Sequence, residues 1–148
     1  MKIRSFDGEG QMDQREVTHR TVSRSDNVFG LPKPDLYSCS VESYRAGLSD
    51  FRIYVYKNKK DEVTEPVFEL VFNSPFYFHG PFGWTGANFR IADESKKTAL
   101  GRQLGWLADT DQIDAAKYLE ELTLFEVEIV STEFTVQILA SSAFRVDR

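Results

Sequence analysis

Cysteine, histidine and long apolar runs are scarce in this sequence. Cys39 is the only cysteine among 148 residues, so an internal disulfide bond is excluded, which fits a reducing compartment. The first ten residues contain no apolar segment of the kind that a secretory signal needs. No stretch approaches the roughly 20 apolar residues of a membrane-spanning helix. We therefore expect a soluble, cytoplasmic protein with no membrane partner.

Positive charge is also in short supply. The chain has 18 Lys and Arg against 23 Asp and Glu, for a formal net charge of −5. This acidic balance argues against attraction to nucleic acid or to anionic lipid. The one basic cluster, at residues 57–60, is followed directly by acids and is typical of a solvated hairpin tip. We expect no nucleic-acid partner.

Sequence motifs of known catalytic and cofactor sites are missing. There is no glycine-rich dinucleotide fingerprint, no phosphate-binding loop with its Lys and Ser or Thr, and no Gly-x-Ser-x-Gly. His19, His79 and Cys39 are not placed at the short spacings that mark zinc sites. We therefore predict neither a cofactor nor a metal.

The composition is that of a folded domain. Hydrophobic residues make up 41% of the chain and aromatic residues 14%, which is too apolar for a disordered protein. A length of 148 residues fits one domain with its own core. We predict a single domain over residues 1–148, with a loosely structured N-terminal segment over residues 1–34, where Gly and Pro are frequent and apolar anchors are few.

Alternating apolar and polar residues dominate the rest of the chain. This pattern predicts strands at 36–44, 51–57, 66–73, 123–131 and 133–141, with shorter ones at 76–80 and 87–92. Helical spacing of apolar residues predicts two short helices within 94–108 and 109–122. We therefore expect a mainly β (α+β) protein of about seven to eight antiparallel strands, with the helices inserted before a C-terminal β-hairpin. A curved sheet and a closed or half-closed barrel both fit.

Aromatic residues and glycines are concentrated in "SPFYFHGPFGWTGANF", residues 74–89. Alternation predicts that Phe76, Phe78 and Phe89 lie in the core. The other bulky side chains form a candidate surface for a ligand or partner: Tyr77, His79, Phe82 and Trp84. For Trp84 a packed lid over the core is the favoured alternative. The three glycines of "GPFGWTG", Gly80, Gly83 and Gly86, are expected to serve turns with positive φ.

Acidic residues are frequent between 109 and 128. They suggest a docking surface for a basic protein, with Asp111, Asp114, Glu126 and Glu128 as its candidate members. Glu126 and Glu128 share the expected outer face of one strand. The plainer alternative is a solvated helix and sheet face with no partner.

Two residues raise the question of catalysis. Cys39 lies inside a predicted strand, where a cysteine usually acts as a small buried hydrophobe rather than a nucleophile. His79 lies at the expected end of a strand, where a general base is often found. A lone histidine also often bonds to a turn backbone, and the sequence names no carboxylate partner for it.

Three functions remain open on this evidence. The first is a non-enzymatic binding or protein-interaction module, for example of an inhibitor or immunity type, that uses the aromatic loop and the acidic surface to hold a basic protein. The second is a barrel or cup that binds a small apolar ligand. The third is a small enzyme of unknown reaction that uses His79. The absence of a catalytic constellation favours the first.

Overall fold

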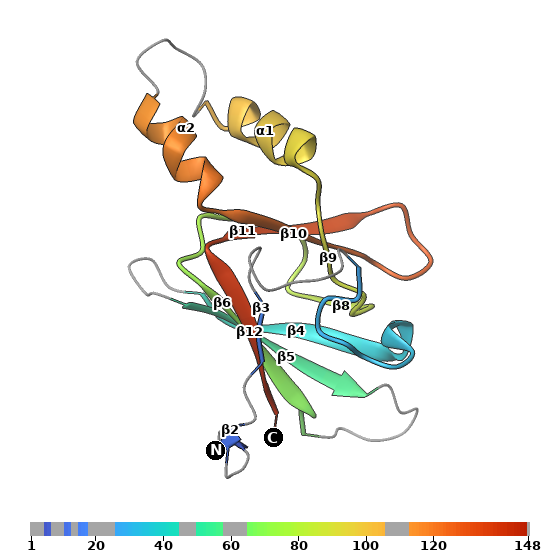
Figure 1. Ribbon diagram of the computed structural model, residues 1–148. Helices are drawn as coiled ribbons and strands as arrows, with labels where there is room; N and C mark the ends of the chain where they lie inside the picture. Colours follow the sequence, from blue (N-terminus) through green and yellow to red (C-terminus); the bar gives the residue numbers. More distant parts are fainter. Residues whose placement is uncertain are drawn as a thin grey trace.

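Two antiparallel sheets and two α-helices make up the architecture (Figure 1). The computed structural model describes residues 5–6, 11–12, 15–17, 26–44, 50–57, 65–105 and 113–147. Strands account for 47% of the structure, which confirms the prediction of a mainly β, antiparallel fold. The sheet is curved and does not close, so the barrel alternative is wrong.

The larger sheet has six strands. In spatial order they are β3 (Arg15–Val17), β12 (Ser142–Asp147), β6 (Phe68–Asn73), β5 (Asp50–Lys57), β4 (Tyr37–Tyr44) and β8 (Gly83–Thr85). β4 and β5 form the hairpin that their alternating side chains predict, with a register shift between Val41 and Ser43. A short 3₁₀ helix, η1 (Pro34–Leu36), leads into β4.

The smaller sheet has four strands. Their order is β7 (Tyr77–His79), β11 (Thr135–Ala140), β10 (Thr123–Glu128) and β9 (Arg90–Ile91). The predicted hairpin of residues 123–131 and 133–141 is confirmed as β10 and β11. A separate two-stranded ribbon joins β1 (Ser5–Phe6) to β2 (Gln11–Met12).

Two passages of the chain between the sheets, from β6 to β7 and from β11 to β12, share one corner. After β6 the chain turns at Ser74, which has φ 48°, and enters the other sheet as β7. After β11 it returns at Ser141 and continues as β12 beside β6. Strands that switch sheets in this way are how packed sheets make corners. The strand β12 itself was not predicted.

The main core fills the space between the two sheets. Its centre is aromatic: the rings of Phe72 from one sheet and Phe125 from the other meet edge to face at 5.3 Å. Phe29 and Leu31 are also fully buried in this core, which corrects the expectation that all of residues 1–34 is loosely structured. The described part of that segment, from residue 26 onward, is anchored by its apolar side chains.

Both helices cover the opposite face of the four-stranded sheet (Figure 1). α1 (Glu94–Gln103) is capped by Asp93, whose carboxylate accepts a hydrogen bond from Lys96 N at 3.0 Å. α2 (Ile113–Glu120) follows. Leu100 of α1 and Leu119 of α2 form a second core on this face with Leu124 of β10, Leu139 of β11 and neighbouring residues. Within the described ranges, neither helix has the length and apolar character needed to cross a bilayer.

Candidate functional site

Trp84, the centre of the aromatic stretch, lies in the main core. Its side chain is 7% exposed, and its indole Nε1 donates a hydrogen bond to the carbonyl of Gly86 at 2.9 Å. It stands directly opposite Cys39 across the β4–β8 ladder. Trp84 therefore packs as a lid on the core, as the favoured alternative expected, and offers no contact surface of its own.

Phe82 behaves in the opposite way. Its side chain is 83% exposed, although its backbone is held by the sheet: Val41 N donates to Phe82 O at 2.7 Å. Gly83, the next residue, is paired with Ser40 in the first register position of β8. The aromatic ring is thus displayed in water from a backbone that the β4 ladder fixes in place.

A second exposed ring, Phe134, was not expected in this position. Phe134 falls within the predicted strand of residues 133–141, but β11 begins one residue later and the Phe134 side chain is 72% exposed. Its backbone is also fixed, since Phe134 O accepts from Ile129 N at 3.0 Å and Phe134 N donates to Thr132 Oγ1 at 3.1 Å. The turn chemistry of Thr132, rather than strand alternation, decides where this ring points.

Phe82 and Phe134 belong to the same end of the molecule. Before Phe82, a Cβ on Gly80 would lie only 3.0 Å from Cγ1 of Val136. After it, Thr85 O accepts a hydrogen bond from Val130 N at 2.9 Å. The chain on both sides of Phe82 therefore contacts the β10–β11 hairpin on both sides of Phe134. We call this region the Phe82–Phe134 surface.

A row of polar residues crosses the four-stranded sheet. Register places Arg90, Glu126, Gln137 and His79 side by side on β9, β10, β11 and β7. At the centre, Glu126 is only 3% exposed. Its Oε1 lies 3.5 Å from both Arg90 Nε and Lys96 Nζ, and its Oε2 accepts from Gln137 Nε2 at 3.1 Å.

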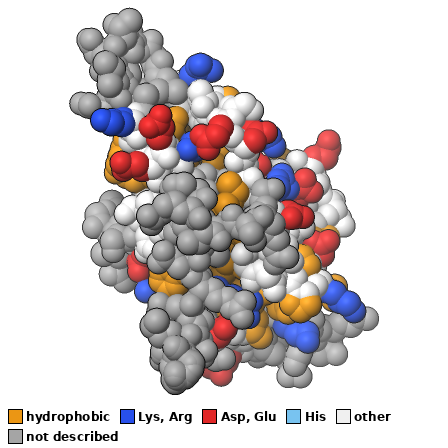
Figure 2. All heavy atoms as spheres, in the orientation of Figure 1, with side chains coloured by type: hydrophobic (Ala, Val, Ile, Leu, Met, Phe, Trp, Pro, Cys, Tyr) orange, Lys and Arg blue, Asp and Glu red, His pale blue; other side chains and the backbone are white. Residues whose placement is uncertain are grey.

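Glu126 therefore does not lie on a solvated face, contrary to expectation. The helices cover the side of β10 on which Glu126 lies. Alternate residues of β10 therefore face the main core on one side and the second core, under the helices, on the other. Glu128 remains 68% exposed and pairs with Arg90 at 3.4 Å. Asp111 is outside the described residues, and Asp114 lies in α2 without a described side chain. Over the helices, acidic and basic side chains are interspersed (Figure 2).

His79 and Cys39 are not brought together. His79 is exposed at the end of β7 and stacks on Tyr77, with ring centroids 6.4 Å apart and planes 14° apart. Cys39 belongs to the other sheet, is 2% exposed, and donates its thiol to Gly86 O at 3.5 Å. Burial raises the pKa of the Cys39 thiol, which keeps it protonated and unreactive.

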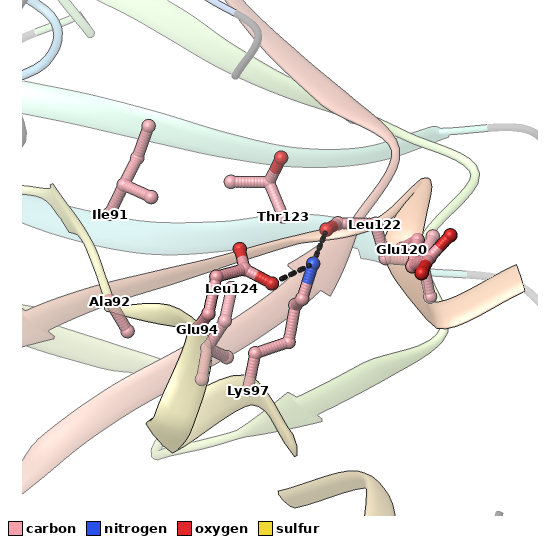
Figure 3. A pocket seen from close by; sticks show the side chains of 8 residues that line it. All are labelled: Ile91, Ala92, Glu94, Lys97, Glu120, Leu122, Thr123 and Leu124. Carbon is pink, nitrogen blue, oxygen red and sulfur yellow. Dashed lines mark hydrogen bonds and ion pairs between the residues drawn. The ribbon is translucent and has the colours of Figure 1, made fainter. Parts of the chain in front are cut away.

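A small pocket lies between the helices and the start of β10 (Figure 3). Its volume is about 40 Å³, and Lys97 reaches into it from α1. Lys97 Nζ donates to the carbonyl of Leu122 at 2.9 Å and lies 3.2 Å from the Glu94 carboxylate, so this buried ammonium ties α1 to the chain between α2 and β10. Small-molecule sites usually enclose about 300–1,000 Å³. Within the described part of the chain, no three metal-ligating side chains gather.

The three glycines of the aromatic loop have three different roles. Gly86 has φ 123°, as predicted, and a Cβ there would lie 2.7 Å from Glu128 O. The prediction of positive φ is wrong for Gly80 and Gly83. Gly80 is small because Val136 packs against it, and Gly83 is an exposed residue of β8.

Comparisons with models of protein families, with curated proteins and with solved structures find no match to this chain.

Proposed function

We propose that this protein is a non-enzymatic interaction module that binds a protein partner through the Phe82–Phe134 surface. The observation that carries the proposal is the 83% exposure of Phe82 on a backbone held by the β4 ladder. Burying a phenylalanine is worth about 1.5–3 kcal/mol. Because the backbone of Phe82 is already held by β4, a partner that covers the ring gains this burial energy and has to pay little entropy for ordering the loop.

The charges near these rings favour a basic partner. Glu42, Glu128 and Glu133 are exposed on the strands and the turn that adjoin Phe82 and Phe134. Figure 2 shows red side chains on the side of the molecule where the β10–β11 turn lies. The net charge of −5 acts in the same direction. A small acidic inhibitor or immunity-type protein that covers a basic site is one concrete form of this function.

The other two functions receive less support. The pocket beside Lys97 is too small for an apolar ligand of ordinary size. The polar row does contain a carboxylate and His79, but Gln137 stands between Glu126 and His79 in the register, so the two do not form a general-base pair. A contact made by Phe82 and Phe134 requires neither a cavity nor a catalytic pair.

The test compares binding by three single variants. The wild-type protein is immobilised at low salt, the captured partner is identified and purified, and its affinity is then measured for each variant. Phe82→Ser and Phe134→Ser are each expected to weaken binding by about tenfold or more. Tyr118→Ser, at an exposed aromatic of α2 on the helix side of the sheet, is the matched control and keeps full affinity. Equal affinity for all variants, or no partner at low salt, contradicts the proposal.

A further inference from the structure

Beside Phe82, the outer edge of β8 presents backbone groups that the β4 ladder does not use. Hydrogen bonds in an antiparallel ladder alternate between paired and unpaired positions. Val41 N donates to Phe82 O and Gly86 N donates to Tyr37 O, so positions 82, 84 and 86 of this strand face β4. The N–H and C=O groups of Gly83 and Thr85 therefore point away from the sheet.

Of these two positions, only Thr85 has a partner among the described residues. Thr85 O accepts a hydrogen bond from Val130 N at 2.9 Å, which shows directly that this edge points outward and is covered there by the β10–β11 turn. For Gly83, no partner is found among the residues that the structure describes. Gly83 is exposed, and a Cβ added to it would meet only Cys39 O, at 3.5 Å, within 4 Å. Among the described residues, no side chain lies within 4 Å of that Cβ.

We propose that an extended segment of the basic partner pairs with β8 at Gly83 as an added strand. This inference rests on the proposed function and specifies how the partner binds. The Gly83 N–H and C=O groups supply main-chain hydrogen bonds, and the neighbouring Phe82 ring supplies the apolar contact that gives a short strand its affinity. The segment ends against the turn at Val130, which already occupies the next position of the edge.

Charge disfavours a second copy of this chain as the occupant. Pairing two β8 edges would bring two sets of Glu42 and Glu133 to one interface, and like charges there are unfavourable. A segment with Lys or Arg next to apolar residues meets the same carboxylates with opposite charge. The occupant is therefore an extended, basic and apolar stretch of a different protein.

Two variants of Gly83 separate backbone pairing from side-chain contact. Gly83→Pro removes the outward N–H but leaves the β4 ladder intact, because proline is tolerated on an edge strand where its nitrogen faces solvent. Gly83→Ala keeps the N–H, and its Cβ makes only an ordinary contact with Cys39 O. A dispersed amide NMR spectrum confirms that each variant is folded.

The probe is a displayed library of random peptides of about eight residues, long enough for a strand of about five to six residues. Enrichment of basic, apolar peptides on the wild-type protein is expected. Their affinity should fall about tenfold on Gly83→Pro and stay unchanged on Gly83→Ala, since the lost hydrogen bond leaves a peptide carbonyl unpaired. The Gly83 amide signal should shift on titration.

The other possible results of the peptide experiment distinguish the two proposals. Peptides that bind Gly83→Pro as tightly as wild type, and lose affinity only on Phe82→Ser, overturn strand addition and leave the proposed function standing. Peptides that ignore both substitutions contradict both proposals. If no peptide is enriched, strand addition is overturned, and the proposed function is then decided by the partner affinities of Phe82→Ser and Phe134→Ser.

Discussion

Asn73 and Ser142, 69 positions apart in the chain, are joined by a hydrogen bond from Asn73 Nδ2 to Ser142 Oγ of 2.9 Å. Asn73 O also accepts from Ser141, at 2.9 Å from its N and 3.0 Å from its Oγ. Asn73 ends β6 and Ser142 begins β12, so this cluster lies where the chain leaves one sheet and where it returns. Two of the crossings between the sheets, from β6 to β7 and from β11 to β12, are thus fastened to each other.

Replacing Asn73 by Ala should loosen this corner. The substitution removes the bond to Ser142 and leaves a half-buried hydroxyl without that donor, so we expect a loss of about 1–2 kcal/mol in the free energy of unfolding. Urea denaturation measures it. In a double-mutant cycle, Ser142→Ala should cost little more once Asn73 is gone. Additive losses from the two substitutions would mean that the bond contributes nothing.

The buried carboxylate of Glu126 should matter for stability rather than for docking. Glu126→Ala leaves Arg90 and Lys96 without their shared partner, and because both cations are partly exposed we expect a loss of about 1–3 kcal/mol. Glu126→Gln keeps an acceptor for Gln137 and should lose less. Glu128→Ala is the exposed control and should stay within about 0.5 kcal/mol of wild type. Denaturant unfolding of the three variants checks this order.

Substituting Gly86 and Gly83 by Ala should change the stability of the protein to different extents. Gly86→Ala puts a Cβ 2.7 Å from Glu128 O at φ 123°, so we expect a loss of about 2 kcal/mol or more. Gly83→Ala makes only a 3.5 Å contact and should be nearly neutral. Thermal unfolding followed by circular dichroism distinguishes the two. Equal melting temperatures would contradict the φ and the close contact at Gly86.

Asp93 should make the stability of α1 depend on pH. The hydrogen bond from Lys96 N, followed by that from Ser95 Oγ, lowers the pKa of Asp93 below its ordinary value of 3.8. A lowered folded-state pKa means that the contribution is complete above the unfolded-state pKa and is lost as pH falls through the folded-state value. Asp93→Asn should therefore be less stable than wild type near neutral pH, with a difference that shrinks in acid. Urea unfolding at about pH 7 and about pH 3 measures both differences.

Tryptophan fluorescence should report the buried state of Trp84. In a Trp106→Phe variant, Trp84 is the only tryptophan, since the chain has two. Its 7% exposure predicts blue-shifted emission that acrylamide quenches poorly. Addition of Phe82→Ser should leave that spectrum unchanged, because Phe82 is displayed in water. Red-shifted, easily quenched emission would mean that the loop does not pack as described.

The local spacing of apolar and polar residues was enough to predict the two hairpins and the first helix. The β4–β5 and β10–β11 hairpins alternate cleanly, and the residues of α1 keep helical spacing, so each was found from the sequence. The fold class follows from the same elements. These predictions depend on neighbours along the chain, which a single sequence displays.

Position in the sheets depends on distant contacts and was not predictable in the same way. β12 alternates weakly, and it is a strand because β6 and β3 flank it. Glu126 looked solvated because alternation cannot tell water from a helix lying over the sheet. Of the candidate site residues, Phe82 is strongly exposed, whereas Trp84 is buried by its place opposite Cys39. The exposure of Phe134 was missed because β11 begins at Thr135, one residue after it, whereas the strand predicted from the sequence includes Phe134.

The return of the chain through the corner has a consequence for folding during synthesis. β12 lies between β3 and β6, so residues 15–17 cannot join the larger sheet until residues 142–147 have left the ribosome. Until then the outer edge of β6 lacks its neighbour, although its partner β5 is available early. Pairings between such distant segments form slowly. Between the synthesis of β6 and that of β12, the nascent chain therefore carries an open strand edge, the kind of surface that chaperones cover.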